Sequence, residues 1–319
     1  MLIILCLCVG VAFLIVGSKI MLEGIKDIGS RYNYSSLTIG ITLVAFGTSI
    51  PELLVSLKAM SLGYSDIVIF NVIGSNIINI LLILGVCSIL NTLKITSNTV
   101  KKELPLTLVA TALFIFLALD DLYKVKANNI ISRYDALILI VFFVIYLILM
   151  GKNILKKKDS EYYYKPKYSL GYGVGLSIIG FCMIFAGSFF TVDMAYKFSE
   201  IGANLKLISV GLIAFSTSIP ELTTCMHLIK SKKDDMVIGN ILGSNIFNIC
   251  VVLGVPIIIY GDLNVNSMSI VDIINFILAA IILYIFAPIR SRIGKFEGII
   301  MIIVLLIYYG FVLWEGLGL

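Results

Sequence analysis

Charged residues are scarce in this chain of 319 residues. Asp, Glu, Lys and Arg make up 13% of it, whereas soluble globular domains carry roughly a quarter. Hydrophobic residues make up 60%. This composition excludes a water-soluble globule and predicts a polytopic membrane protein. Apolar stretches of ~20 residues, the helix length that a bilayer core of ~30 Å requires, recur between short polar connections. The period-2 alternation of membrane-spanning strands is absent, so we predict an all-α protein.

Histidine is almost absent, and cysteine occurs without a recognisable pattern. The one histidine, His227, has no partner at zinc-binding spacing. An intramembrane protease or lipid hydrolase is therefore disfavoured, and we predict neither an enzyme nor a bound cofactor. No basic residues precede the first apolar stretch, so we expect a first membrane helix there rather than a cleaved signal peptide. The six cysteines lie in apolar segments without disulfide or metal-site spacing, so we expect packing roles for them: Cys6, Cys8, Cys87, Cys182, Cys225 and Cys250.

What the sequence does contain is a series of ten apolar spans. Their approximate limits are residues 2–24, 36–60, 67–91, 103–120, 133–151, 169–195, 205–229, 236–260, 268–288 and 297–315. The longest connection, residues 152–168, is rich in lysine and is predicted to be cytoplasmic. Because five helices precede it, we expect a protein of the cell membrane with its N-terminus on the outer side. Because topology accounts for the basic loops and the net charge of +5, we expect no nucleic-acid partner.

Residues near the ends of the spans suggest interfacial positions. Asp193 and Asp272 lie near predicted span ends and are expected at the membrane interface. Tyr308, Tyr309 and Trp314 fit an aromatic belt, since aromatic rings with a polar edge favour the headgroup level.

The strongest feature is a motif that occurs twice. Residues 43–53, Leu-Val-Ala-Phe-Gly-Thr-Ser-Ile-Pro-Glu-Leu, recur at residues 212–222 with only two differences. A second block, residues 66–80, recurs at residues 235–249 with the same offset of 169. Since each repeat holds five predicted spans, an odd number, the second copy enters the membrane from the opposite side. We predict an inverted repeat, with residues 1–151 and 169–319 as the two halves, and a site at the bilayer midplane.

The repeated motifs have the chemistry of an ion site. Pro51 and Pro220 lack an N–H group and break the helix near Gly47 and Ser216. The freed carbonyls must line a cavity or be capped, for which a bound cation is suitable. Carboxylate, hydroxyl, amide and carbonyl oxygens favour Ca²⁺ or Na⁺ over Zn²⁺ or Cu²⁺.

The charge of the two motifs gives the strongest indication of which ion they bind. A carboxylate at midmembrane costs at least ~2.5 kcal/mol, and no Lys or Arg lies within either motif to offset Glu52 or Glu221. Two glutamates together match one divalent ion. The alternative reading of single residues such as Ser49, Ser75 or Asn79 is polar packing between helices.

On these motifs, the chain resembles the cation/calcium antiporter superfamily and most closely its prokaryotic sodium/calcium exchangers, over nearly the whole length. The resemblance implies that Glu52, Glu221 and the carbonyls of Thr48 and Thr217 bind Ca²⁺. It implies that Asn79 and Asn248 complete this central site. It further implies that flanking Na⁺ is held by the Ala45 carbonyl, Ser49 and Ser75 on one side, and by the Ala214 carbonyl, Ser218 and Ser244 on the other.

Two positions depart from the family pattern. Ser216 replaces a glycine, and Asn248 stands where some relatives have aspartate. The central site therefore has two carboxylates, and we expect no potassium dependence. The short linker leaves no room for the regulatory domain of animal exchangers.

The resemblance also implies a mechanism. It suggests three Na⁺ per Ca²⁺ and net charge movement. We also expect alternating access, in a chain that functions as a monomer. The first and sixth helices, which carry Gly10, Gly17, Gly180 and Gly187, would slide across the other helices.

Two rivals remain open. In a Ca²⁺/H⁺ antiporter, protons on Glu52 and Glu221 would replace Na⁺, although the four flanking serines favour Na⁺. A channel is the other rival, although duplicated carboxylates in inverted halves favour an occluded site over a continuous pore.

Overall fold

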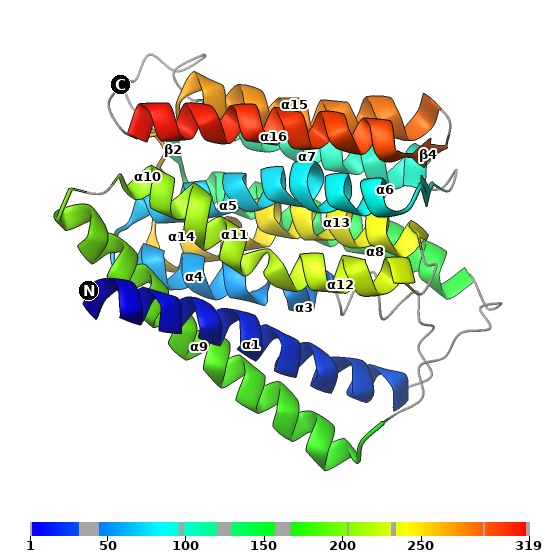
Figure 1. Cartoon of the computed structure of the whole chain (residues 1–319), viewed down its shortest axis with the longest axis horizontal. Helices are drawn as coiled ribbons and strands as arrows, with labels where there is room; N and C mark the ends of the chain where they lie inside the picture. Colours follow the sequence, from blue (N-terminus) through cyan, green and yellow to red (C-terminus); the bar gives the residue numbers. More distant parts are fainter. Residues whose placement is uncertain are drawn as a thin grey trace.

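The structure is a computed structural model, and it describes residues 2–31, 45–95, 99–119, 129–156, 167–202, 204–230, 234–289 and 291–316. These residues form a bundle of helices with four two-residue strands (Figure 1). The elements up to the linker are α1 (Leu2–Arg31), α3 (Ala45–Thr48), α4 (Ile50–Ser61), α5 (Ser65–Ile77), η2 (Ile78–Leu84), α6 (Gly85–Leu90), β1 (Leu93–Lys94), η3 (Thr99–Glu103), α7 (Leu104–Ala118), β2 (Ile130–Ile131) and α8 (Arg133–Lys156).

The elements after the linker repeat much of this order. They are α9 (Leu170–Glu200), α10 (Leu205–Ile208), η5 (Ser209–Ile213), α11 (Ala214–Thr217), α12 (Ile219–Lys230), α13 (Asp234–Phe247), η6 (Asn248–Val252), α14 (Gly254–Tyr260), β3 (Leu263–Asn264), α15 (Ile270–Ile289), β4 (Arg292–Ile293) and α16 (Lys295–Gly316). The segments labelled η are π-helical.

The predicted membrane helices are largely present. Seven helices in the described residues are long and apolar enough to cross a membrane, and the bent pair of residues 205–217 and 219–230 makes an eighth candidate. The predicted span 36–60 falls partly outside the described residues, and the predicted span 103–120 contains the 15-residue α7. The protein is therefore a mostly helical multi-pass membrane protein. The structure extends α8 to Lys156, and most of the predicted cytoplasmic linker lies outside the described residues.

Corresponding helices of the two halves run in opposite directions. In Figure 1, α5 and α6 run from left to right, whereas α13 and α14 run from right to left. The broken helices α3–α4 and α10–α12 are likewise opposed. The short strands join the halves at opposite ends of the bundle, where β1 pairs antiparallel with β4 and β2 with β3.

The long helices α1 and α9 pack against each other through glycines spaced by seven residues. Gly10, Gly17 and Gly24 of α1 face Gly187, Gly180 and Gly173 of α9, so the helices are antiparallel. A Cβ atom added at Gly17 would lie only 2.8 Å from the Gly180 carbonyl oxygen. Small residues allow such close approach between membrane helices. The pair lies along one side of the bundle (Figure 1).

Polar contacts close the end of this helix pair nearest the linker. The Asp27 carboxylate accepts hydrogen bonds from the backbone N–H groups of Lys167 and Tyr168 and pairs with Arg31 at 3.3 Å. Arg31 also donates to the Tyr168 carbonyl. Glu23 accepts from the Lys167 ammonium at 3.2 Å. The start of α9 is therefore fixed to the end of α1.

Two of the residues expected at the interface are buried against other parts of the protein. Asp272 is fully buried, and its carboxylate pairs with Lys206 at 2.7 Å and accepts a hydrogen bond of 3.0 Å from the Tyr308 hydroxyl. Tyr308 is likewise buried, so its ring packs against protein. The packing role predicted for all cysteines holds for the buried Cys87, Cys225 and Cys250, but Cys8 and Cys182 are exposed on the outer helices.

Candidate functional site

Each copy of the first motif forms a broken helix. In the first copy α3 ends at Thr48, Ser49 has φ −91° and ψ 8°, and α4 begins at Ile50 with Pro51 in its first turn. Proline is tolerated there because the first N–H groups of a helix have no partner within the helix. The break therefore falls at Ser49, two residues after the predicted position, Gly47.

The second copy repeats this geometry. Here α11 ends at Thr217, Ser218 has φ −82° and ψ −1°, and α12 begins at Ile219. The axes on either side of the break differ by 40°. Pro220 cannot donate to the carbonyl of Ser216 four residues earlier, whereas the Ser218 N–H still donates to the Ala214 carbonyl at 3.1 Å.

The two motif glutamates lie near each other inside the bundle. Glu52 and Glu221 are both completely buried, and their carboxyl groups are close enough to interact electrostatically. Glu52 lies beside Thr217 and Ser218 of the second half. Glu221 in turn accepts a hydrogen bond of 2.9 Å from Ser49 of the first half. Each carboxyl group therefore reaches the broken helix of the opposite half.

These carboxyl groups have few protein partners. Both oxygens of Glu52 and Oε2 of Glu221 make no hydrogen bond, although they are buried. The nearby lysines pair elsewhere in the described part of the chain: Lys58 lies 3.5 Å from Asp193, and Lys206 pairs with Asp272. Buried carboxylates without partners are costly. The pair therefore requires protons or a bound cation.

Hydroxyl groups and backbone carbonyls surround the glutamates. The Ala45 carbonyl accepts from Thr48 at 3.0 Å and from Ser244 of the other half at 3.2 Å. The Ser49 hydroxyl, whose one hydrogen goes either to this carbonyl or to Glu221, lies 3.2 Å from the carbonyl oxygen. In the second half, Thr217 donates to the Ala214 carbonyl at 3.2 Å. These contacts, with those of the glutamates, join nine of the twelve predicted residues in one buried cluster: Ala45, Thr48, Ser49, Glu52, Ala214, Thr217, Ser218, Glu221 and Ser244.

The other three predicted residues lie on the adjoining helices. Ser75 on α5, Asn79 on η2 and Asn248 on η6 are fully buried. Asn79 donates to Asn245 of the opposite half at 3.0 Å. The Ser75 hydroxyl and both polar atoms of the Asn248 side chain lack a hydrogen-bond partner. Both asparagines lie in π-helical turns, which are rare and recur at functional sites, and the sequence pattern did not predict these turns.

Sequence reasoning also missed asparagines that support the site. Asn71 donates to the Glu52 carbonyl at 3.1 Å and to the Ser56 hydroxyl at 3.0 Å. Its counterpart Asn240 donates to the sulfur of Cys225 at 3.6 Å. Their equivalent positions in the two copies of the second block were the available signal. Each contacts the α-helix that carries a motif glutamate, α4 or α12.

The assembled donors suit a hard cation. Carboxylate, hydroxyl, carbonyl and amide oxygens are the ligands of Ca²⁺ and Na⁺. In the described ranges no group of three or more His, Cys, Asp and Glu side chains could hold a metal. The acidic component of the candidate site is therefore the pair of glutamates.

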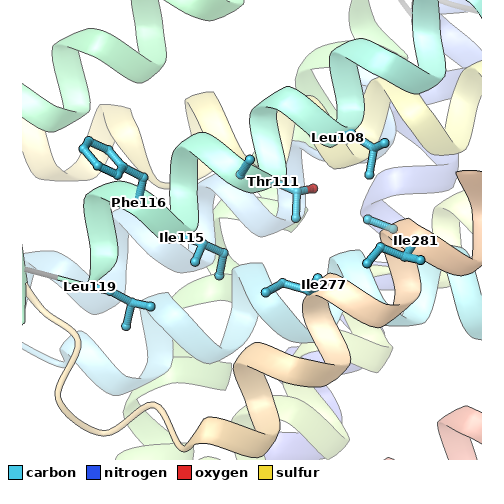
Figure 2. A pocket seen from close by; sticks show the side chains of 9 residues that line it. Leu108, Thr111, Ile115, Phe116, Leu119, Ile277 and Ile281 are labelled. Carbon is cyan, nitrogen blue, oxygen red and sulfur yellow. The ribbon is translucent and has the colours of Figure 1, made fainter. Parts of the chain in front are cut away.

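A separate groove lies between α7 and α15 and has different chemistry. It has a volume of about 500 Å³, and its lining side chains point into it from the two helices (Figure 2). The one hydroxyl group in its lining, that of Thr111, donates to the Thr107 carbonyl at 2.9 Å. An apolar groove of this kind cannot bind ions, so it is distinct from the candidate site.

Comparison with known proteins identifies the family of this chain. A family model described as "Sodium/calcium exchanger protein" matches residues 2–152 and 172–314. The chain is 34% identical over 259 residues to a putative antiporter, CaxA, of Alkalimonas amylolytica, with 79% of each chain covered. It is 28% identical to the sodium/calcium exchanger MaX1 of Methanosarcina acetivorans, covering 93% of this chain and 94% of that protein.

Solved structures give the same result. A structure of the sodium-calcium exchanger NCX_Mj is similar with a TM-score of 0.69 and 30% sequence identity, covering 96% of this chain and 97% of the other. The family model and this solved structure each match nearly the whole length of the chain. The chain belongs to the sodium/calcium exchanger protein family.

Proposed function

We propose that this protein is a secondary antiporter that exchanges Na⁺ for Ca²⁺ across a cell membrane. The observation that carries the proposal is the pair Glu52 and Glu221. They come from opposite halves, are fully buried, lie close enough to interact electrostatically and lack a basic partner in the described residues. Two negative charges match one Ca²⁺. Ca²⁺ would bind between them with the carbonyls of Thr48 and Thr217.

Na⁺ would bind at flanking positions rich in hydroxyl groups. The hydroxyl oxygens of Ser49 and Ser244 both lie 3.2 Å from the Ala45 carbonyl oxygen, so hydroxyl and carbonyl oxygens from both halves converge there. On the other side, the unpartnered Ser218 hydroxyl lies beside Glu52. The Ala214 carbonyl and Ser75 would complete these positions, and Asn79 and Asn248 would line the centre. Several Na⁺ together would neutralise the glutamates as one Ca²⁺ does.

Alternating access follows from the charge of the site. An empty site with two buried carboxylates is costly to close off from water, so the site should switch sides only when Ca²⁺ or Na⁺ is bound. The opposed directions of α3–α4 and α10–α12 support an inverted repeat of residues 1–151 and 169–319. In such an architecture the two halves present the same site to opposite sides of the membrane.

We further propose an exchange of three Na⁺ for one Ca²⁺ with net charge movement, by a monomer. Its N-terminus would lie outside and its linker, residues 152–168, in the cytoplasm. The ten-helix arrangement belongs to the same proposal. The α1–α9 pair, joined through its glycines, would then move as one body against the other helices.

A Ca²⁺/H⁺ antiporter is the second candidate. Both oxygens of Glu52 and Oε2 of Glu221 lack hydrogen-bond partners, so they are free to bind protons. This alternative uses the same two carboxyl groups and differs only in the driving ion.

Uptake of ⁴⁵Ca²⁺ into liposomes containing the purified protein separates the candidates. An outward Na⁺ gradient at clamped pH should drive uptake, and a membrane potential should change its rate. Glu52→Gln and Glu221→Gln should each abolish it. Glu200→Gln, at the exposed C-terminal end of α9, is the matched control and should transport normally. Uptake driven only by a pH gradient would establish the proton-coupled alternative.

A further inference from the structure

Two asparagines at equivalent positions in the halves make different hydrogen bonds. Asn245 donates through Nδ2 to the backbone carbonyl of Asn76 at 3.4 Å, and its Oδ1 accepts from Asn79 Nδ2 at 3.0 Å. Asn76 instead donates within its own helix to the Val72 carbonyl at 2.7 Å. Both side chains are almost completely buried. The hydrogen bonds of the two halves therefore differ at the site, although the sequence repeats there.

The Asn76 carbonyl fixes the direction of the whole chain of hydrogen bonds. A backbone carbonyl can only accept, so Asn245 must turn its NH₂ group toward it and its oxygen toward Asn79. Asn79 must then turn its own NH₂ group toward Asn245. The atom left over is Asn79 Oδ1, which is buried and has no hydrogen-bond partner. An amide oxygen, not an amide nitrogen, is the atom that a hard cation binds.

We propose that Asn245 is a positioning residue that holds the Asn79 side chain with its oxygen available to the transported cation. This inference rests on the proposed function. The counterpart arrangement is missing in the other half, where both polar atoms of Asn248 lack partners and Asn76 is turned toward Val72. Asn79 is thus a fixed ligand and Asn248 an unrestrained one. Asn245 should therefore matter for ion affinity and Asn76 should not.

The first test compares Asn245→Ala with Asn76→Ala, which is the same change at the equivalent buried position. Apparent Ca²⁺ affinity is measured both by equilibrium ⁴⁵Ca²⁺ binding in detergent and by uptake. Loss of one orienting hydrogen bond should weaken Ca²⁺ affinity about fivefold in Asn245→Ala, whereas Asn76→Ala, which keeps the backbone carbonyl, should stay close to the wild type. Asn245→Ser is too short to make both hydrogen bonds and gives the same test if the alanine variant folds poorly.

The second test asks whether orientation is the cause. A carboxylate at position 79 has two equivalent oxygens and no donor, so either face of the group can present an oxygen to the cation. Its oxygen would also repel Asn245 Oδ1. In an Asn79→Asp background, Asn245→Ala should leave Ca²⁺ affinity unchanged or raise it. An equal loss of affinity in both backgrounds, or equal effects of Asn245→Ala and Asn76→Ala, would overturn the inference and leave the proposed function intact. If the wild type binds no Ca²⁺, the proposed function fails and the inference fails with it.

Discussion

The glycine contact between α1 and α9 allows a quantitative prediction. A Cβ atom at Gly180 would lie 2.4 Å from the Met21 nitrogen and 2.6 Å from the Gly17 carbonyl oxygen. Ordinary contacts begin at 3.4 Å, so the helices would have to separate by about 1 Å, because the atoms in the way are backbone atoms that cannot rotate aside. Overpacking of this kind costs about 1–3 kcal/mol.

Gly180→Ala should therefore lower the melting temperature of the purified protein by a few degrees, since about 1 kcal/mol corresponds to roughly 2–4 °C in a protein of moderate size. Gly175→Ala on the same helix is the control, because an added Cβ meets no atom within 4 Å there. Thermal unfolding in detergent and Ca²⁺ uptake are measured for both. If Gly180→Ala melts like Gly175→Ala, α1 and α9 are not packed through their glycines and the reasoning is wrong.

Three further predictions concern single residues. Burial opposes ionisation of Asp27, but the N–H groups of Tyr168 and Lys167 and the charge of Arg31 lower the pKa of its carboxyl group. The ionised carboxylate therefore stabilises the folded protein above the unfolded pKa of about 3.9. This stabilisation is lost as the pH falls through the lower pKa of the folded state. Melting temperatures at pH 5 and pH 3 should therefore differ more for the wild type than for Asp27→Asn, and equal differences would contradict this. Ser49→Ala removes the hydrogen bond to Glu221 and should weaken the Na⁺ dependence of uptake about fivefold or more, whereas Ser61→Ala, which removes only an exposed bond to the Lys58 carbonyl, should not. Asn248→Asp adds a third buried carboxylate that must be neutralised by a cation or a proton, so uptake should depend more steeply on pH than in the wild type; an unchanged pH profile would show that position 248 does not face the ions.

Much of the site could be predicted because the sequence carries it twice. A proline followed by a glutamate, repeated with one offset, indicated that Glu52 and Glu221 converge, and their burial and mutual interaction agree with that. The helix break predicted near Gly47 is confirmed, and it falls at Ser49 because Pro51 is accommodated in the first turn of α4.

Contacts between distant segments could not be read from the sequence. Asp272 lies near a predicted span end, and nothing in the sequence indicated that Lys206 of α10 would pair with it and compensate its burial. The asymmetry between Asn245 and Asn76 is invisible in two identical Gly-Ser-Asn triplets, because it depends on which carbonyl each side chain meets. π-helical turns likewise have no pattern of their own in apolar sequence.

The central claim is that Glu52 and Glu221 hold one divalent ion together. The most direct test is the stoichiometry of ⁴⁵Ca²⁺ binding to the purified wild type, to Glu52→Gln, to Glu221→Gln and to the double variant. If both carboxylates share one ion, the wild type binds one Ca²⁺ at the site, each single variant loses nearly all of this binding, and the double variant is no worse. If each single variant instead keeps one of two independent sites and only the double variant loses both, the account is contradicted.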